Sequence, residues 1–247
     1  NTYTITASNS GGSSTTTITI IVNDAAPSSI QYSPSSSVLT KDVAMGNVTP
    51  TYSGGAAISW TISPTLPAGL SFNTSTGEVG GTPTIVSPST VYTVTANNAG
   101  GSGTTTITIQ VNDVPPYLLS YSGSPFTLTK GSVMTPANPS SSGGDVETWS
   151  ISPSLPSGLS MNPTTGEISG TPVQISSTTI YTVTATNTGG NTTAQVSITI
   201  NDVIPSSIVY NGAPYTLTKD SAMVADTPSI SGGDVESWSI LPSLPTG

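Results

Sequence analysis

The sequence contains no cysteine and no histidine among its 247 residues. Without cysteine, neither disulfide bonds nor thiolate metal sites are available. Without histidine, the commonest general base and the commonest metal ligand are also missing. No candidate nucleophile has a base near it, and the acidic residues stand at scattered single positions. We therefore expect a protein that is not an enzyme.

Basic residues are almost as scarce, with 3 Lys and Arg against 12 Asp and Glu, which gives a net charge of −9 and a pI near 4.1. A nucleic-acid-binding surface needs a basic patch to displace counterions from phosphate. Attraction to anionic membranes needs the same positive charge. No apolar run approaches the ~20 residues of a membrane-spanning helix. We expect no nucleic-acid partner and no membrane insertion in this segment.

Helix signals are nearly absent, and strand and turn signals take their place. Glycine (25 residues) and proline (21 residues) interrupt the chain every few residues, together with Ser, Thr and Asn. β-Branched residues fill the intervals, a pattern typical of short strands joined by turns. The many Ser and Thr residues keep the surface soluble without charge.

The chain repeats itself with a period of 89 residues and no insertion or deletion. The same step relates three tryptophans, three lysines and three aspartates: Trp60, Trp149 and Trp238; Lys41, Lys130 and Lys219; Asp24, Asp113 and Asp202. A period of this length suits one small domain and exceeds that of helical or β-solenoid repeats, at about 20–50 residues. We expect a C-terminal hairpin of an incomplete repeat at 1–24, complete repeats at 25–113 and 114–202, and the first part of another at 203–247. We also expect the chain to be a slice of a longer polypeptide.

Within 25–113 the pattern predicts about seven short strands. They are expected at 28–32, 38–40, 48–52, 58–62, 78–79, 91–96 and 104–111. Apolar residues alternate with Ser and Thr in the fourth, where Ile58, Trp60 and Ile62 share one face. The predicted core includes Trp60, Trp149, Trp238, Tyr92 and Tyr181. The fold class is therefore all-β: tandem, immunoglobulin-like, antiparallel β-sandwich domains.

Three motifs recur in both complete repeats and resemble a known family. They are WTISPTLPAGLS at Trp60–Ser71, STGEVGGTP at Ser75–Pro83 and YTVTANN at Tyr92–Asn98, each with a close copy 89 residues later. They resemble the "putative Ig domain" repeats of bacterial and archaeal surface proteins, within the cadherin-like and immunoglobulin-like group. The resemblance implies an extracellular or cell-surface location. It also implies a role as spacer, adhesin stalk or accessory module.

The aspartates at the joints between repeats leave two alternatives open. The stretch Val111–Pro116 resembles the calcium-binding linker of cadherins, which implies a weak calcium site. Calcium needs six to eight oxygen ligands, and the acids available for it are Asp24, Asp113, Asp202, Glu78 and Glu167. In the other alternative each joint aspartate caps a turn through the nearby backbone, and the protein needs no cofactor.

Each complete repeat also has one early lysine, one glutamate and one asparagine at the end of its last strand. These are Lys41, Glu78 and Asn112 in one repeat and Lys130, Glu167 and Asn201 in the other. Some Ig-like domains of bacterial pili and adhesins join such a Lys and Asn in an isopeptide bond, beside a buried acid. The alternative is a solvated lysine that discourages pairing at a strand edge. We expect no such bond.

These observations favour a structural function. We expect a segment of a long surface stalk or filament, which acts as a spacer and contacts neighbouring repeats and, in a filament, identical chains. The alternative is an adhesin or an array of glycan-binding modules. Glycan sites offer exposed aromatic side chains, so the exposure of four tyrosines distinguishes the two: Tyr32, Tyr52, Tyr121 and Tyr210.

Overall fold

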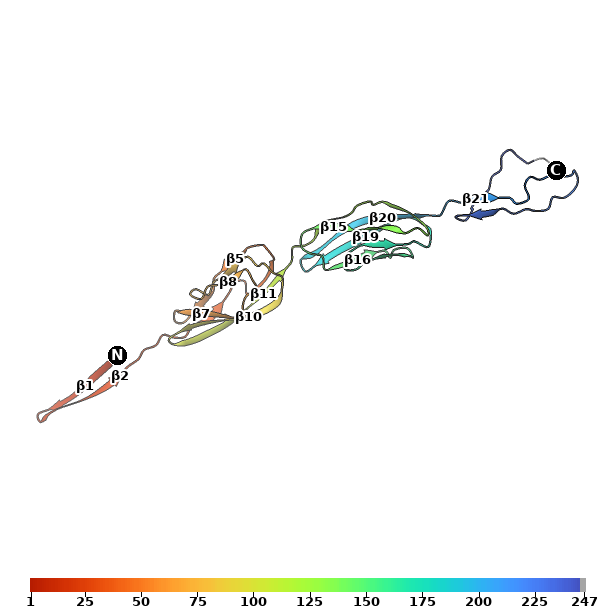
Figure 1. Ribbon diagram of the computed structural model, residues 1–247. Helices are drawn as coiled ribbons and strands as arrows, with labels where there is room; N and C mark the ends of the chain where they lie inside the picture. Colours follow the sequence, from red (N-terminus) through yellow and green to blue (C-terminus); the bar gives the residue numbers. More distant parts are fainter. Residues whose placement is uncertain (245–247) are drawn as a thin grey trace. The chain divides into compact units, whose positions relative to one another are not determined.

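The computed structural model describes residues 1–244, in which every regular element is a β-strand (Figure 1). Residues 245–247, the end of the fragment expected at 203–247, lie outside the described residues. The chain divides into two compact units, Asn1–Val114 and a second unit that begins at Pro115. Each unit contains one complete repeat and one fragment.

The first complete repeat has a four-stranded sheet, a three-stranded sheet and a strand pair. The four-stranded sheet has the order β4 (Ser36–Thr40), β11 (Gly101–Asn112), β10 (Ser87–Asn98) and β7 (Ser59–Ser63). The three-stranded sheet has the order β5 (Met45–Val48), β9 (Val79–Gly81) and β8 (Leu70–Phe72), and the pair is β3 (Ser28–Gln31) with β6 (Thr51–Ser53). All pairings are antiparallel except that of β4 with β11, which is parallel.

The second complete repeat has the same strands in the same order. Its four-stranded sheet is β13 (Phe126–Thr129), β20 (Gly190–Asn201), β19 (Ser176–Asn187) and β16 (Thr148–Ser152). The others are β14 (Met134–Ala137), β18 (Ile168–Gly170) and β17 (Leu159–Met161), and the pair β12 (Tyr117–Tyr121) with β15 (Pro139–Ser142). The β13–β20 pairing is again parallel.

Alternating side chains of the two long strands form the core of the first repeat. Tyr92, Val94 and Ala96 of β10 are buried, as are Ile107, Ile109 and Val111 of β11. They pack against Ile30, Tyr32 and Val79 from the other strands. The predicted all-β, immunoglobulin-like sandwich is confirmed. Ile58, expected on the inner face, is instead 73% exposed because β7 begins one residue later.

The two fragments have little core of their own. The first is the hairpin of β1 (Thr2–Asn9) and β2 (Gly12–Thr19), which is exposed throughout. The second contains β21 (Ser206–Val209) and β22 (Ser229–Ser231). Trp238 was expected in a core, and this is wrong: it is 54% exposed. In a complete repeat this tryptophan lies on β7 beside β10, whereas residues 203–244 contain no counterpart of β10.

A tryptophan and a glycine meet at the centre of each complete repeat. Gly77 has φ +75°, and a Cβ atom added to it would lie 2.7 Å from Cδ2 of Trp60. The Tyr32 hydroxyl donates a hydrogen bond to the Gly77 carbonyl at 2.5 Å, and the backbone N–H of Trp60 donates to the Thr74 carbonyl at 2.8 Å. The turn that contains Gly77 is thus fixed against the indole from both sides.

The second repeat copies this arrangement with Trp149, Gly166 and Tyr121. An added Cβ on Gly166 would lie 2.6 Å from Cδ2 of Trp149, and the Tyr121 hydroxyl donates to the Gly166 carbonyl at 2.6 Å. Burial raises the pKa of both phenols, that of Tyr121 to about 12. Both therefore remain protonated hydrogen-bond donors at neutral pH.

The two tryptophans differ in exposure, and the repeats also differ in the residue that stands at the position of Tyr52. Trp60 is 2% exposed, and the Tyr52 ring meets its indole edge-on, with centroids 5.3 Å apart and an interplanar angle of 71°. Trp149 packs against the core of its repeat, as predicted, but is only partly buried. The position of Tyr52 is held by Ser141 in the second repeat, so one edge of Trp149 lacks its cover.

We expect Gly77→Ala to destabilise the first repeat by about 2–4 kcal/mol, because the new methyl group would overlap the indole and the residue would keep a positive φ. Urea denaturation followed by Trp60 fluorescence, with Trp149→Phe and Trp238→Phe in the background, measures this. Gly46→Ala is the matched control, since no atom lies within 4 Å of its added Cβ. Equal effects of the two changes would contradict the prediction.

We expect Ser141→Tyr to cover Trp149 as Tyr52 covers Trp60, and to stabilise the second repeat by about 0.5–1.5 kcal/mol, the value of an aromatic pair. Acrylamide quenching of Trp149 should fall, and the urea midpoint should rise. Tyr52→Ser should have the opposite effects on Trp60. If quenching changes in neither variant, the ring contact does not determine the exposure.

Candidate functional site

In the four-stranded sheet of the first repeat, β4 and β11 are adjacent, and both end where the chain leaves the repeat. In the second repeat the same holds for β13 and β20. In the parallel register Thr40 lies opposite Asn112, the last residue of β11. The Lys41 N–H extends the ladder by donating to the Asn112 carbonyl at 2.8 Å. In the second repeat the Lys130 N–H donates to the Asn201 carbonyl at 2.9 Å. The Lys and Asn considered for an isopeptide bond in each repeat are therefore neighbours through their backbones.

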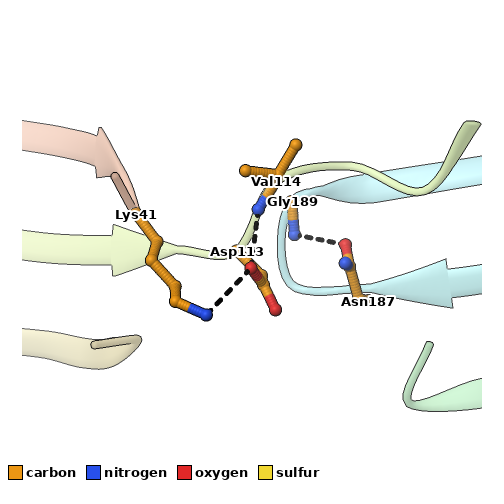
Figure 2. Close-up of polar contacts among 5 residues, drawn as sticks. All are labelled: Lys41, Asp113, Val114, Asn187 and Gly189. Carbon is orange, nitrogen blue, oxygen red and sulfur yellow. Dashed lines mark hydrogen bonds and ion pairs between the residues drawn. The ribbon is translucent and has the colours of Figure 1, made fainter. Parts of the chain in front are cut away.

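The lysine side chains instead approach the aspartates. Lys41 Nζ lies 4.0 Å from Asp113 Oδ1, which also accepts a hydrogen bond from the Val114 N–H at 2.8 Å (Figure 2). Lys130 Nζ lies 3.8 Å from Asp202 Oδ1, which accepts the Val203 N–H at 2.8 Å. We call each set of lysine, aspartate and following N–H the exit bracket. It ties the first residues of the joint to the strand that begins the sheet.

The exit brackets position the chain more than they stabilise it. The Lys41 and Asp113 side chains are 34% and 11% exposed, and those of Lys130 and Asp202 are 40% and 31% exposed. Ion pairs as open as the second contribute about 0–1 kcal/mol, because water and salt screen them. The hydrogen bond from the following N–H has the shorter distance and fixes one peptide of the joint.

The glutamates expected beside these lysines lie elsewhere. Glu78 precedes β9, and its carboxylate accepts hydrogen bonds from Asn47 Nδ2 at 2.8 Å and Thr49 Oγ1 at 3.3 Å. The Asn112 amide oxygen accepts from Gln110 Nε2 at 2.7 Å. The structure thus does not assemble Lys41, Glu78 and Asn112 into one site. Glu167 precedes β18, the counterpart of β9, so it is likewise in the other sheet from Lys130 and Asn201.

The carboxylates considered for calcium are also dispersed. Asp113 and Asp202 belong to exit brackets, Glu78 and Glu167 to the other sheet, and Asp24 is exposed. Within residues 1–244, no three Asp, Glu, His or Cys side chains come close enough to hold a metal ion. Asp113 and Asp202 instead each accept the N–H of the following residue.

The chain enters each repeat at the end opposite to the exit bracket. The Ala25 carbonyl accepts hydrogen bonds from the Gly55 N–H at 3.1 Å and from Asn98 Nδ2 at 2.7 Å. Asn98 adjoins the β10–β11 turn, where its Oδ1 also accepts the Gly100 N–H at 2.8 Å. Asn187 makes the corresponding turn contact with the Gly189 N–H at 2.9 Å (Figure 2). Sequence reasoning missed these asparagines, although each precedes a Gly-rich turn at the same position.

The four tyrosines proposed as a test of glycan binding do not form a repeated exposed set. Tyr32 and Tyr121 are 6% and 7% exposed, whereas Tyr52 and Tyr210 are 41% and 42% exposed. The counterpart of Tyr52 in the second repeat is Ser141. The complete repeats therefore do not share an aromatic surface at these positions.

Comparison with known proteins finds two tandem repeats of one family in the chain. The sequence model of the family described as "Putative Ig domain" matches residues 23–112 and 113–201. The chain is 33% identical over 175 residues to the "Serine-rich adhesin for platelets" of Staphylococcus aureus strain MRSA252, which covers 68% of this chain and 12% of that protein. The protein of the same name from strain MSSA476 is also 33% identical, over 68% of this chain and 7% of its own length. The expected resemblance is confirmed, and the chain spans only a small part of these relatives.

Solved structures with similar folds include three Ig domains of titin, I67–I69, in a Glu-to-Ala variant. That match has a TM-score of 0.46 and 20% identity, and it covers 81% of this chain and 74% of the titin chain. Domains EC1-2 of human Protocadherin-24 match with a TM-score of 0.33 and 14% identity, over 72% of this chain and 99% of theirs. In the part of the chain that the structure describes, no helix is long and apolar enough to cross a membrane.

The exit bracket predicts different effects for two substitutions of Asp202. Asp202→Asn keeps an oxygen for the Val203 N–H and loses only the ion pair, so we expect a cost below about 1 kcal/mol. Asp202→Ala also leaves the N–H without its acceptor and should cost about 1–2 kcal/mol. Urea denaturation of the whole chain in low and high salt measures both. Equal costs that vanish in high salt would show that the ion pair is the main contribution.

Proposed function

The chain belongs to the "Putative Ig domain" family, and from this membership and the geometry of its repeats we propose that it is a spacer in a surface stalk. It is an extracellular or cell-surface segment of tandem Ig-like repeats. Its family and its adhesin relatives are not enzymes. The proposed segment has no catalytic activity of its own and serves to span distance.

One observation carries the spacer proposal: the chain enters and leaves a repeat at opposite ends of its longest strand. Ala25 is bound beside the β10–β11 turn, and Asn112 ends β11 at the exit bracket. The strand between these ends has 12 residues. At about 3.4 Å per residue it is about 40 Å long, so each repeat advances the chain by about this distance.

A sandwich with this path separates the two ends of the repeat by the full length of β11. The ends of the repeat are separated by paired strands and a packed core, so the distance between them is fixed by hydrogen bonds. A joint of a few residues with proline has little freedom, which favours extended arrays. In such an array each repeat contacts mainly its neighbours along the chain.

A binding function is the second candidate, and its support is the name of the relatives. They are described as adhesins for platelets, and this chain matches 12% or less of their length. That share fits either a binding module or the stalk that presents one. The uneven exposure of the tyrosines does not favour a glycan site in each repeat. We therefore place the spacer role first.

Arrays with two, four and six copies of the complete repeat test the proposal. We expect the maximum dimension from small-angle X-ray scattering to grow by about 40 Å for each added repeat. Electron microscopy of the same arrays should show unbranched rods or chains. Growth with about the cube root of the number of repeats would indicate a compact assembly and contradict the spacer role.

A further inference from the structure

Each complete repeat contains a single basic residue, which follows the first strand of the four-stranded sheet. Lys41 and Lys130 are these two residues, and the third lysine of the chain is Lys219. Secreted proteases of the trypsin class cleave after a basic residue, because their specificity pocket contains a carboxylate. A complete repeat therefore offers such a protease one peptide bond, which joins Lys41 to Asp42 in the first repeat and Lys130 to Gly131 in the second.

In the first repeat the backbone on both sides of this peptide bond is held by distant segments. The Lys41 N–H donates to the Asn112 carbonyl at the end of β11, at 2.8 Å. The Asp42 N–H belongs to the susceptible bond itself and donates to the Pro83 carbonyl at 2.8 Å. Pro83 is fully buried and follows β9, which is in the other sheet. The bond is thus tied to both sheets of the sandwich.

The second repeat holds its peptide bond in the same way. The Lys130 N–H donates to the Asn201 carbonyl at 2.9 Å, and the Gly131 N–H donates at 2.8 Å to the carbonyl of Pro172, which is also fully buried. A protease binds its substrate as an extended strand that needs free backbone groups. Asp42 and Gly131 instead have φ of +62° and +77°. The lysine would also have to leave the ion pair of its exit bracket.

The turn at Lys219 has a similar backbone conformation but lacks these contacts. Asp220 has φ +62°, like Asp42. Within residues 203–244 the turn has one backbone hydrogen bond, from the Ser221 N–H to the Thr218 carbonyl at 3.2 Å, and residues 215–218 form no strand. Lys219 is exposed and forms no ion pair in the described part of the chain. A single local bond opens easily, so the conformation of the turn alone does not protect its peptide bond.

We propose that a trypsin-class protease cannot cut a complete repeat while the repeat is folded, and that it cuts the folded chain after Lys219. Cleavage transfers the Lys219 acyl group to the serine of the protease and then to water, which leaves a carboxylate on Lys219 and a free amino group on Asp220. In a complete repeat the same reaction requires both N–H groups to leave their partners in the two sheets. Such opening is about as rare as unfolding of the whole repeat.

This property goes beyond the spacer role and does not depend on it. A surface segment is exposed to secreted proteases, and each repeat needs at least one basic residue for its exit bracket. The hydrogen bonds from the lysine and from the residue after it place that basic residue where a protease cannot bind the backbone.

Digestion of the whole chain with trypsin in native buffer, followed by intact-mass measurement, tests the proposal. We expect a rapid cut after Lys219 and then a product of residues 1–219 that persists. The bonds after Lys41 and Lys130 should be cut about 1,000-fold more slowly or less, since small folded domains are unfolded for about one part in 10³ or less of the time. In urea, cutting after Lys130 should accelerate as steeply as the repeats unfold, as measured by circular dichroism.

Ser154→Lys is the matched control. Ser154 is exposed in the connection between β16 and β17, and the N–H groups of Ser154 and Leu155 donate to no backbone carbonyl within residues 1–244. The introduced lysine lies in the same repeat as Lys130, but no backbone hydrogen bond closes its peptide bond. It should be cut roughly as fast as the bond after Lys219. Circular dichroism confirms that the variant is folded.

Three outcomes would overturn the proposal. Cutting after Lys41 or Lys130 as fast as after Lys219 would show that the backbone hydrogen bonds do not protect the turn. Slow cutting after Lys219, or at the lysine introduced by Ser154→Lys, would show that these bonds are not what limits the protease. Cutting after Lys130 at a rate that urea does not change would show that the turn opens without unfolding of the repeat.

Discussion

The contact between one tryptophan and one glycine determines the arrangement of each repeat. Gly77 and Gly166 lie so close to Trp60 and Trp149 that a methyl group has no room, and their positive φ closes the turn before β9 and β18. The tyrosine that holds the glycine carbonyl comes from the first strand of the repeat, 45 residues away in the chain. Three distant segments therefore meet at one point, which explains why all three must keep their spacing. The Tyr52 edge contact is an addition to this arrangement and not a part of it, because the second repeat folds with Ser141 in its place.

Much of the fold follows from local patterns in the sequence, and the exceptions are contacts between distant segments. The alternation of Tyr92, Val94 and Ala96 gave the inner face of β10 correctly, since a strand places every second residue on one side. The parallel pairing of β4 with β11 has no local signal, because the two strands are far apart in sequence. Their outward residues are mostly Ser and Thr, which do not specify a partner strand. Trp238 shows the same limit: its strand pattern resembles that of Trp60, but residues 203–244 contain no counterpart of β10 to bury it.

The candidate site illustrates why residue types alone assign partners poorly. Lysine, asparagine and aspartate occur in the same order in both repeats. Reasoning from chemistry left two alternatives open for each: a bond to the asparagine or a solvated position for the lysine, and a calcium site or a turn cap for the aspartate. The structure places Lys41 beside both residues, but its N–H contacts the Asn112 carbonyl and its ammonium group faces Asp113. The backbone of Lys41 is thus paired with Asn112, and its side chain extends to the next residue, Asp113. The partner of Glu78 could not be predicted from the sequence either. In the structure it is Asn47, but Pro136 stands at that position in the second repeat, so the pair does not recur as a pattern.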